Sequence, residues 1–458
     1  MSRGQFLGTA AGLVASATAP ADAPAGQENK RPNVLLILVD DLGYGDLACY
    51  GAQDLCTPNV DALAASGIRF TRFYSNCPVC SPTRASVLTG RYPDAVGVPG
   101  VIRTHRDNSW GKLAEDAALL PTVLEPAGYN TAIVGKWHLG LASPDTPTER
   151  GFGFFHGFLG DMMDDYYTHR RHGNNYMRRN RETIDPEGHA TDLFSQWAID
   201  YIHDQAREEA PFFLYLAYNA PHTPIQPPDE WVERVTQRQP GIDPERARIA
   251  ALIEHLDDGV GRVLAALDET GQGDNTLVIF ASDNGGQDNV GADNAGLHGA
   301  KQDMFEGGIR VPMCASWPGH VLPHPGIAAV AMTMDLFPTV CEACGAPFSH
   351  TIDGVSLIPI LTGSATGTGE RTLFWVRREG GPHYGGRDYY AARRGPWKLL
   401  QNTPFEPMAL YNLDEDPLEE RPIGTDHAMY KRLFQELRGH INDVGTVPWQ
   451  RPAGQDVL

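Results

Sequence analysis

The chain has 458 residues, of which 41% are hydrophobic and 21% are charged, as expected for a soluble globular protein with a large buried core. Its formal net charge of −20 argues against nucleic acid and anionic membrane as general partners. Seven cysteines in a chain of this length exclude a dense disulfide framework, and the sequence leaves their pairing open.

The first 30 residues are predicted to be a leader outside the fold. Residues 2–8 resemble a twin-arginine export motif without its second arginine. Residues 21–26 include the small side chains typical of the site where an export signal is cleaved. No run in the chain reaches the roughly 18 apolar residues that a transmembrane helix needs. We therefore expect an exported protein, periplasmic or extracellular, with a disordered cytosolic tail as the alternative interpretation of residues 1–30.

Four strands are predicted to be buried on both faces, because their apolar runs show no polar alternation. The runs are residues 34–39, 131–134, 212–218 and 277–281. Two helical patterns lie between these runs. One, between the second and third runs, is capped by Thr191, and the other, between the third and fourth, begins at Asp243-Pro244 and ends near Gly271. This alternation predicts an α/β fold with a large mixed, mainly parallel sheet flanked by helices.

Polar side chains follow each predicted strand at once, at its carboxyl end. In open parallel sheets ligands bind beyond these ends, so we expect the polar side chains to meet there. They are Asp40 and Asp41, Lys136 and His138, His222, and Asp283 and Asn284.

A smaller C-terminal α+β domain is predicted after the flexible, glycine-rich residues 363–369. Short strands are expected at residues 373–377, 388–393 and 397–401, followed by a helix over residues 426–440. The predicted organisation is a leader over residues 1–30, a catalytic domain over 31–365 and a C-terminal domain over 366–458.

Residues 80–91 form the most informative motif of the chain, Cys-Ser-Pro-Thr-Arg-Ala-Ser-Val-Leu-Thr-Gly-Arg. Pro82 suits the first position of a helix, whose free N–H groups would face Cys80 and lower the pKa of its thiol. Cys77 and Cys80 also fit the spacing of a redox pair, which is the alternative interpretation.

Cys-x-Pro-x-Arg followed by Leu-Thr-Gly-Arg matches the signature of the type I sulfatases in every defined position. The resemblance covers roughly residues 31–440 and implies an alkaline phosphatase-like fold. It also implies that a formylglycine-generating enzyme converts Cys80 to formylglycine, whose hydrate is the nucleophile.

Asp40, Asp41, Asp283 and Asn284 offer only oxygen ligands, which Ca²⁺ and Mg²⁺ prefer and zinc does not. Taken alone, Asp40-Asp41 or Asp283-Asn284 would more often belong to a turn than to a metal site. The resemblance implies that together with residue 80 they bind one metal ion, Ca²⁺ with Mg²⁺ as the alternative.

The resemblance also implies roles for the remaining site residues. Arg84 would hold the nucleophile, and Lys136 and Lys301 would bind the sulfate oxygens. His138 would take a proton from residue 80, and His222, with Lys301, would protonate or hydrogen-bond the departing alcohol. Among the predicted substrate contacts, which are Lys136, His222, Lys301 and His298, the last stands where many relatives have arginine.

The basic run over residues 169–181 predicts the kind of substrate. The run is either a solvated loop or a rim that guides a polyanion, and we favour a sulfated carbohydrate. A phosphomonoester or phosphonate hydrolase of the same superfamily and a non-catalytic binding protein are the alternative functions.

Overall fold

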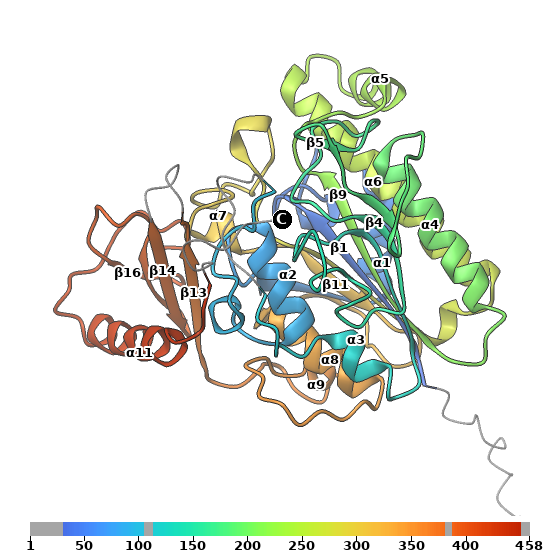
Figure 1. The fold of residues 1–458 in the computed structure, drawn as a ribbon. Helices are drawn as coiled ribbons and strands as arrows, with labels where there is room; N and C mark the ends of the chain where they lie inside the picture. Colours follow the sequence, from blue (N-terminus) through green and yellow to red (C-terminus); the bar gives the residue numbers. More distant parts are fainter. Residues whose placement is uncertain (1–30, 105–112, 381–386, 450–458) are drawn as a thin grey trace, which may run out of the picture. The chain divides into compact units, whose positions relative to one another are not determined.

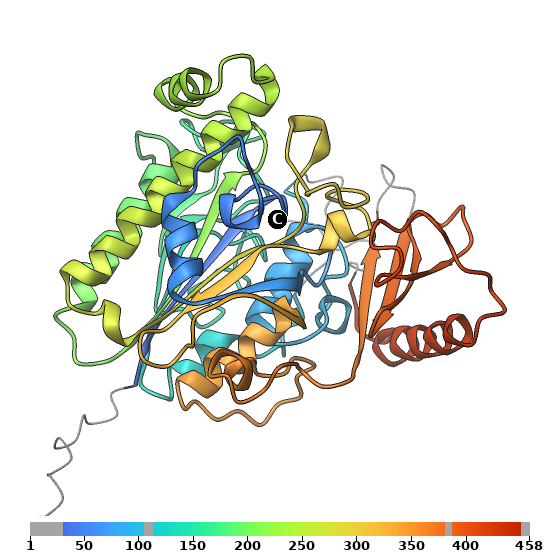
Figure 2. The ribbon, with the colours of Figure 1, turned by 180° about the vertical axis from the view of Figure 1, so that it is seen from behind.

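A ten-stranded mixed sheet is the centre of the fold in the computed structural model, which describes residues 31–104, 113–380 and 387–449 (Figures 1 and 2). The strand order is β12-β2-β11-β10-β1-β9-β3-β4-β7-β8. These strands are β1 Asn33–Asp40, β2 Ile68–Tyr74, β3 Asn130–Lys136, β4 Phe154–Phe158, β7 Met177–Arg179, β8 Glu182–Thr183, β9 Phe212–Pro221, β10 Thr276–Ser282, β11 Met313–Ser316 and β12 His324–Met332. The leader predicted for residues 1–30 lies outside the described residues.

The four predicted strands are adjacent and parallel. β1 pairs with β10 on one side and with β9 on the other, and β3 continues the parallel part next to β9. β11 and β7 run antiparallel to their neighbours, so the sheet is mixed. The predicted fold class, with a large and mainly parallel sheet, is confirmed.

Helices cover both faces of the sheet. Successive side chains of β1 point to opposite faces, and each face packs in its own apolar cluster. Val34, Leu36 and Leu38 pack with one set of helices, and Leu35, Ile37 and Val39 pack with the other. The first set is α2 Cys80–Thr89, α3 Leu120–Leu124, α8 Leu336–Ala343 and α9 Ile358–Leu361, and the second is α1 Pro58–Ser66, α4 Ala190–Gln205 and α6 Pro244–Glu269. Figure 1 shows α2 in front of the sheet, and Figure 2 shows α1 and α6 from the opposite side.

Shorter elements complete the main part of the chain. They are α5 Asp229–Arg238, α7 Glu306–Ile309, the strand pair β5 Arg170–Arg171 and β6 Asn174–Asn175, and 3₁₀ helices at Ala48–Tyr50, Pro93–Val96, Gly273–Asn275, Asp288–Val290 and Thr333–Asp335. Among the described residues no helix has the length and apolar character needed to cross a membrane.

Helix starts were predicted with mixed success. Asp243 caps α6 as predicted, since its carboxylate accepts from the backbone N–H of Glu245 at 3.0 Å. The predicted cap of α4 was wrong, because His189 Nδ1 accepts from the N–H of Thr191 and Thr191 lies inside the first turn. α2 begins at Cys80, two residues before the predicted proline start.

The C-terminal part is a four-stranded antiparallel sheet with one long helix, whereas three strands and one helix were predicted. Its strands are β13 Thr372–Arg378, β14 Asp388–Arg394, β15 Trp397–Gln401 and β16 Ala409–Asn412, in that order, and its helix is α11 Ala428–Val444. The four-residue β16 was not predicted. The described residues from Arg31 onward belong to one compact unit, and the domain boundary predicted at residue 365 falls between α9 and β13.

Both faces of the C-terminal sheet are buried. Leu433 and Leu437 of α11 pack on one face, and on the other Trp375 packs in a cluster that includes Tyr74 of the main sheet. This second face joins the C-terminal sheet to the main one by apolar contact.

Truncation of Leu437 to alanine should lower the free energy of unfolding by about 2–5 kcal/mol, because it opens a cavity under α11. Urea denaturation followed by circular dichroism measures the change. Leu418, which is 39% exposed, is the matched control, and its alanine variant should stay within about 0.5 kcal/mol of the parent. Equal effects of the two substitutions would contradict the packing assigned to α11.

Candidate active site

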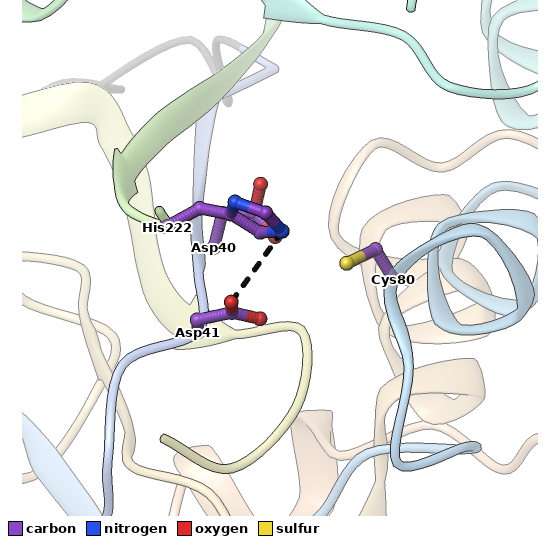
Figure 3. Close-up of side chains that lie close together, drawn as sticks. All are labelled: Asp40, Asp41, Cys80 and His222. Atoms are coloured by element: carbon purple, nitrogen blue, oxygen red, sulfur yellow. Dashed lines mark ion pairs between the residues drawn. The ribbon is translucent and has the colours of Figure 1, made fainter. Parts of the chain in front are cut away.

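The carboxyl ends of the parallel strands bring the predicted polar residues together. Asp40 ends β1, Lys136 ends β3, and His222 follows directly after β9. Cys80 is the first residue of α2, and its sulfur faces Asp40, Asp41 and His222 (Figure 3). Ligand atoms of Asp40, Asp41, Cys80 and His222 all lie within 4.8 Å of one another.

Two buried oxygen atoms in this cluster fit a hard cation. Asp40 Oδ1 and Asn284 Oδ1 have no hydrogen-bond partner among the described residues. The other oxygen of the Asp40 carboxylate and the amide nitrogen of Asn284 are both engaged, the latter with Asp41 Oδ1 at 2.7 Å. Asp40 Oδ1 lies 3.6 Å from a guanidinium nitrogen of Arg84, beyond hydrogen-bond distance. Because buried acceptors without a hydrogen bond are costly, and both of these atoms are oxygens, the arrangement suits Ca²⁺ or Mg²⁺.

Three cations neutralise three carboxylates in the same buried space. Lys136 Nζ lies 2.5 Å from Asp40 Oδ2, Arg84 donates to Asp283 Oδ2 at 2.7 Å, and Lys301 Nζ donates to Asp41 Oδ2 at 2.7 Å.

The two carboxylates at the centre respond differently to this environment. Burial would raise the pKa of Asp40, but the charges of Lys136, His222 and Arg84 lower it well below its ordinary value. Burial and the neighbouring Asp40 raise the pKa of Asp283 to about 7, and Arg84 only partly offsets them. Repulsion between the two carboxylates is the condition that a bound divalent cation would relieve.

Burial keeps the Cys80 thiol protonated. Burial and then the charge of Asp40 raise the pKa of Cys80 well above its ordinary value, although Lys136 opposes them. The thiol pKa predicted from the helix start alone was therefore wrong, because burial outweighs the helix terminus. Cys77 is also a free cysteine whose thiol pKa is raised by burial, so neither thiol has the lowered pKa of a redox pair.

His138 presents a lone pair beside Cys80. Its Nε2 lies 2.8 Å from the carbonyl oxygen of Ile102, which can only accept, so Nε2 carries the hydrogen. Nδ1 is buried and has no hydrogen-bond partner among the described residues. Burial, and then the charge of Lys136, lowers the pKa of His138 well below its ordinary value, so the ring is a neutral base.

His222 and Lys301 form a coupled pair. His222 Nδ1 donates to the carbonyl of Thr223 at 2.7 Å, which leaves Nε2 to accept from Lys301 Nζ at 2.9 Å. Burial and Lys301 lower the pKa of His222, although Asp41 opposes them. Burial would lower the pKa of the Lys301 ammonium group, but the neighbouring acidic groups, Asp41 foremost, together outweigh burial and raise it. Lys301 is therefore the proton-carrying member of the pair.

A cavity of about 160 Å³ opens beside Cys80 and is lined by His138, His222 and Lys301. Loop residues that no motif marked also line it, namely Val79, Val101, Arg103, Asp161, Met162, Thr223, Gln287 and Gln302. Lys136 contacts Asp40 instead and does not line the cavity. Its predicted contact with sulfate stays a prediction.

His298 lies outside this cavity. Its ring stacks on Phe305 with centroids 3.7 Å apart, and Nδ1 lies 3.3 Å from the carbonyl oxygen of Glu419. The substrate contact predicted for His298 has no support in these contacts and stays a prediction.

Two of the five arginines in the basic run over residues 169–181 are neutralised by nearby carboxylates. Arg170 forms a two-pronged pair with Asp185, and Arg171 pairs with Asp161 at 2.9 Å and with Asp164 at 2.8 Å. Asp161 lines the cavity beside Cys80, so Arg171 reaches the rim of the site only through a carboxylate. These pairs weaken the prediction that the run attracts a polyanion.

Comparison with known proteins places the chain among sulfatases. A family profile described as Sulfatase matches residues 32–346, and one described as N-sulphoglucosamine sulphohydrolase, C-terminal, matches residues 296–446. Human N-acetylgalactosamine-6-sulfatase is 36% identical over 354 residues, which cover 72% of this chain and 66% of the relative. Human arylsulfatase A is 33% identical over 444 residues, which cover 85% of this chain and 82% of the relative.

A solved structure agrees with these relatives. The crystal structure of Ps i-CgsB in complex with k-i-k-neocarrahexaose is 31% identical, has a TM-score of 0.84, and covers 93% of this chain and 96% of that chain. The fold and the site together define a sulfatase, a hydrolase of sulfate esters. The chain belongs to the sulfatase family, which confirms the resemblance and the fold class predicted from the sequence.

The tautomer of His138 gives the first test of the site. We expect ¹⁵N-resolved NMR to show a neutral ring with its hydrogen on Nε2 between pH 5 and 8, because the pKa of this base lies well below its ordinary value of about 6.5. Titration of His138 near pH 6.5 would contradict the assignment of Nδ1 as a free base.

Proposed function

We propose that this chain hydrolyses sulfate monoesters of carbohydrates through residue 80, converted from cysteine to formylglycine. The main support is the position of Cys80, which faces a carboxylate cluster with two buried oxygens that have no hydrogen-bond partner among the described residues, an arrangement suited to a cation. Its raised thiol pKa makes the unmodified side chain a poor nucleophile at neutral pH.

Asp40, Asp41, Asp283 and Asn284 are the residues that would hold the ion, for which we propose Ca²⁺. When bound, the ion supplies positive charge that stabilises anionic oxygens and lowers the pKa of a coordinated hydroxyl. Arg84 is fixed by Asp283 and would hold residue 80, while Lys301, at the cavity, would contact the sulfate oxygens. Fixed charges of this kind stabilise the charge that develops during attack on sulfur.

Proton movement follows from the two histidines. Lys301 carries the proton beside His222, so this pair would protonate the departing alcohol oxygen. His138 Nδ1, with its free lone pair, would accept the proton from a hydroxyl on residue 80. The two histidines line the same cavity as Cys80, which leaves room for the ester between acid and base.

The substrate class is proposed from the relatives. One is named for a sulfated amino sugar, and the solved structure at 31% identity holds an oligosaccharide. We propose a sulfated glycan for this chain, maturation by a formylglycine-generating enzyme, and export from the cytoplasm. A phosphomonoester is the second candidate, because the same cations and the same nucleophile could act on it.

Mass spectrometry of the peptide that contains residue 80, purified from a host with the maturation enzyme, should find an aldehyde in place of the thiol. Cys80→Ala should abolish turnover of 4-nitrophenyl sulfate, because it removes the nucleophile. Cys77→Ala is the matched control and should retain activity. An unmodified thiol in fully active protein would rule out the mechanism.

Matched sulfate and phosphate esters separate the two candidate activities. We expect a higher kcat/KM for 4-nitrophenyl sulfate than for 4-nitrophenyl phosphate, because the family profile and the relatives that match this chain are those of sulfatases. Equal or faster turnover of the phosphate would reverse this order.

Elemental analysis should find one Ca²⁺ or Mg²⁺ per chain, and its removal by chelation should abolish turnover until the ion is restored. Asp283→Ala should lower both metal content and rate, because it removes an oxygen ligand. Asp288→Ala, an exposed aspartate five residues further on, should change neither. Zinc in place of these ions would contradict the ligand assignment.

A further inference from the structure

Lys301 is attached to the site differently from its partners. Asp40 and Lys136 end strands of the main sheet and His222 follows one, whereas Lys301 lies in a loop between the 3₁₀ helix Asp288–Val290 and α7. A loop lysine needs some other restraint to hold its ammonium group 2.7 Å from Asp41 and 2.9 Å from His222. The backbone N–H of Lys301 donates to the carbonyl of Gly286 at 3.0 Å, and the residues that follow Lys301 are restrained by contacts outside the parallel strands.

The residue after Lys301 is held in a costly conformation. Gln302 has φ +83°, in the left-handed region that side chains other than glycine rarely adopt. Such a conformation persists only where surrounding contacts determine it. A relaxed Gln302 would change the direction of the chain at Lys301.

Two hydrogen bonds hold the backbone of Gln302, one at its N–H group and one at its carbonyl group. Its N–H donates to the carbonyl of Pro78 at 2.9 Å, two residues before Cys80. Its carbonyl accepts from Arg377 Nη1 at 2.7 Å, and Arg377 belongs to β13 of the C-terminal sheet. The turn after Lys301 is therefore fixed between the loop of the nucleophile and the C-terminal sheet.

Arg377 is itself fixed. Its side chain is buried, its Nε donates to Glu379 Oε1 at 2.9 Å, and its guanidinium lies over the ring of Tyr389 at 4.8 Å. Glu379 is fully buried, so the charge of Arg377 has a carboxylate partner inside the protein. A planar guanidinium can serve Glu379 and the Gln302 carbonyl at once, which an ammonium group cannot do with the same geometry.

Other residues of the C-terminal part hold the same loop. Asn402 accepts from the N–H of Met304 at 2.6 Å and donates to Asp303 at 2.8 Å. The buried Lys398 of β15 donates to Glu306 at 3.0 Å. These contacts fix the far end of the loop, while Arg377 acts next to Lys301.

We propose that Arg377 is a positioning residue, which holds Gln302 in its left-handed conformation and thereby keeps the Lys301 ammonium against Asp41 and His222. The proposal rests on the proposed function, since it assigns Arg377 a part in the same reaction. Arg377 acts through Lys301 and does not line the cavity beside Cys80.

Arg377→Lys keeps the positive charge beside Glu379 and removes the guanidinium fork. We expect kcat/KM for 4-nitrophenyl sulfate to fall about 10- to 100-fold, because a small displacement of a catalytic group is costly in rate. The dissociation constant for inorganic sulfate, measured by titration calorimetry, should rise several-fold without any turnover being involved.

Arg371→Lys is the matched control. Arg371 also joins the C-terminal part to the main one through a carboxylate, Asp335 at 2.8 Å, but among the described residues it makes no hydrogen bond or ion pair with the loop of Lys301. Its lysine variant should lose a similar amount of thermal stability and keep kcat/KM within about threefold of the parent.

Gln302→Gly separates positioning from general destabilisation. Glycine adopts a positive φ without strain, so the turn no longer needs Arg377 to hold it. The factor by which Arg377→Lys lowers kcat/KM should be much smaller in the Gln302→Gly background than in the parent.

Equal losses in the two backgrounds, or an Arg371→Lys variant as impaired as Arg377→Lys, would overturn the positioning role. A parent protein that carries formylglycine yet shows no sulfatase turnover would overturn the proposed function, and the role of Arg377 with it. An active parent with an unaffected Arg377→Lys variant would overturn the inference alone.

Discussion

Mutual neutralisation of buried charge is the constraint on which the site depends. Asp40, Asp41 and Asp283 lie out of water with Lys136, Lys301 and Arg84, and each carboxylate has a cation within 2.7 Å. A buried charge without its partner costs several kcal/mol, so none of these groups can be lost or displaced independently. The parallel strands bring the three carboxylates and Lys136 together, because the carboxyl ends of β1, β10 and β3 lie at one edge of the sheet, whereas Arg84 comes from α2 and Lys301 from a loop.

Much of the sheet and of the candidate site could be predicted, because the apolar strands and the polar residues that follow them are close together in the sequence. Each central strand is a continuous apolar run, and its functional residues come within a few positions of its end, so strand prediction and site prediction were the same step. What escaped prediction depends on contacts remote in sequence. The pKa of Cys80 is set by burial and Asp40, and Arg103 and Gln287 reach the cavity from loops without any motif.

The C-terminal sheet looked from the sequence like an appended unit, and its packing gives it a larger part. One face lies under α11, and the other joins Tyr74 and Met304 in a shared apolar cluster. A motif search reads residues in one stretch, whereas the partners of residues 302–306 are Arg377, Lys398 and Asn402, about 75 to 100 positions away. Side-chain hydrogen bonds over such distances leave no periodic trace in the sequence.

The order of the strands has a consequence for biosynthesis. Asn33 pairs with Thr276, so the centre of the sheet cannot close until the chain has been made well beyond residue 276. At about 5–20 residues per second, synthesis from residue 80 to that point takes on the order of 10–40 s. During this interval Cys80, almost fully buried in the finished fold, is not yet enclosed by the sheet. If Cys80 is converted to formylglycine as proposed, a sheet built from distant segments sets the time window for that conversion, which closes when the chain folds.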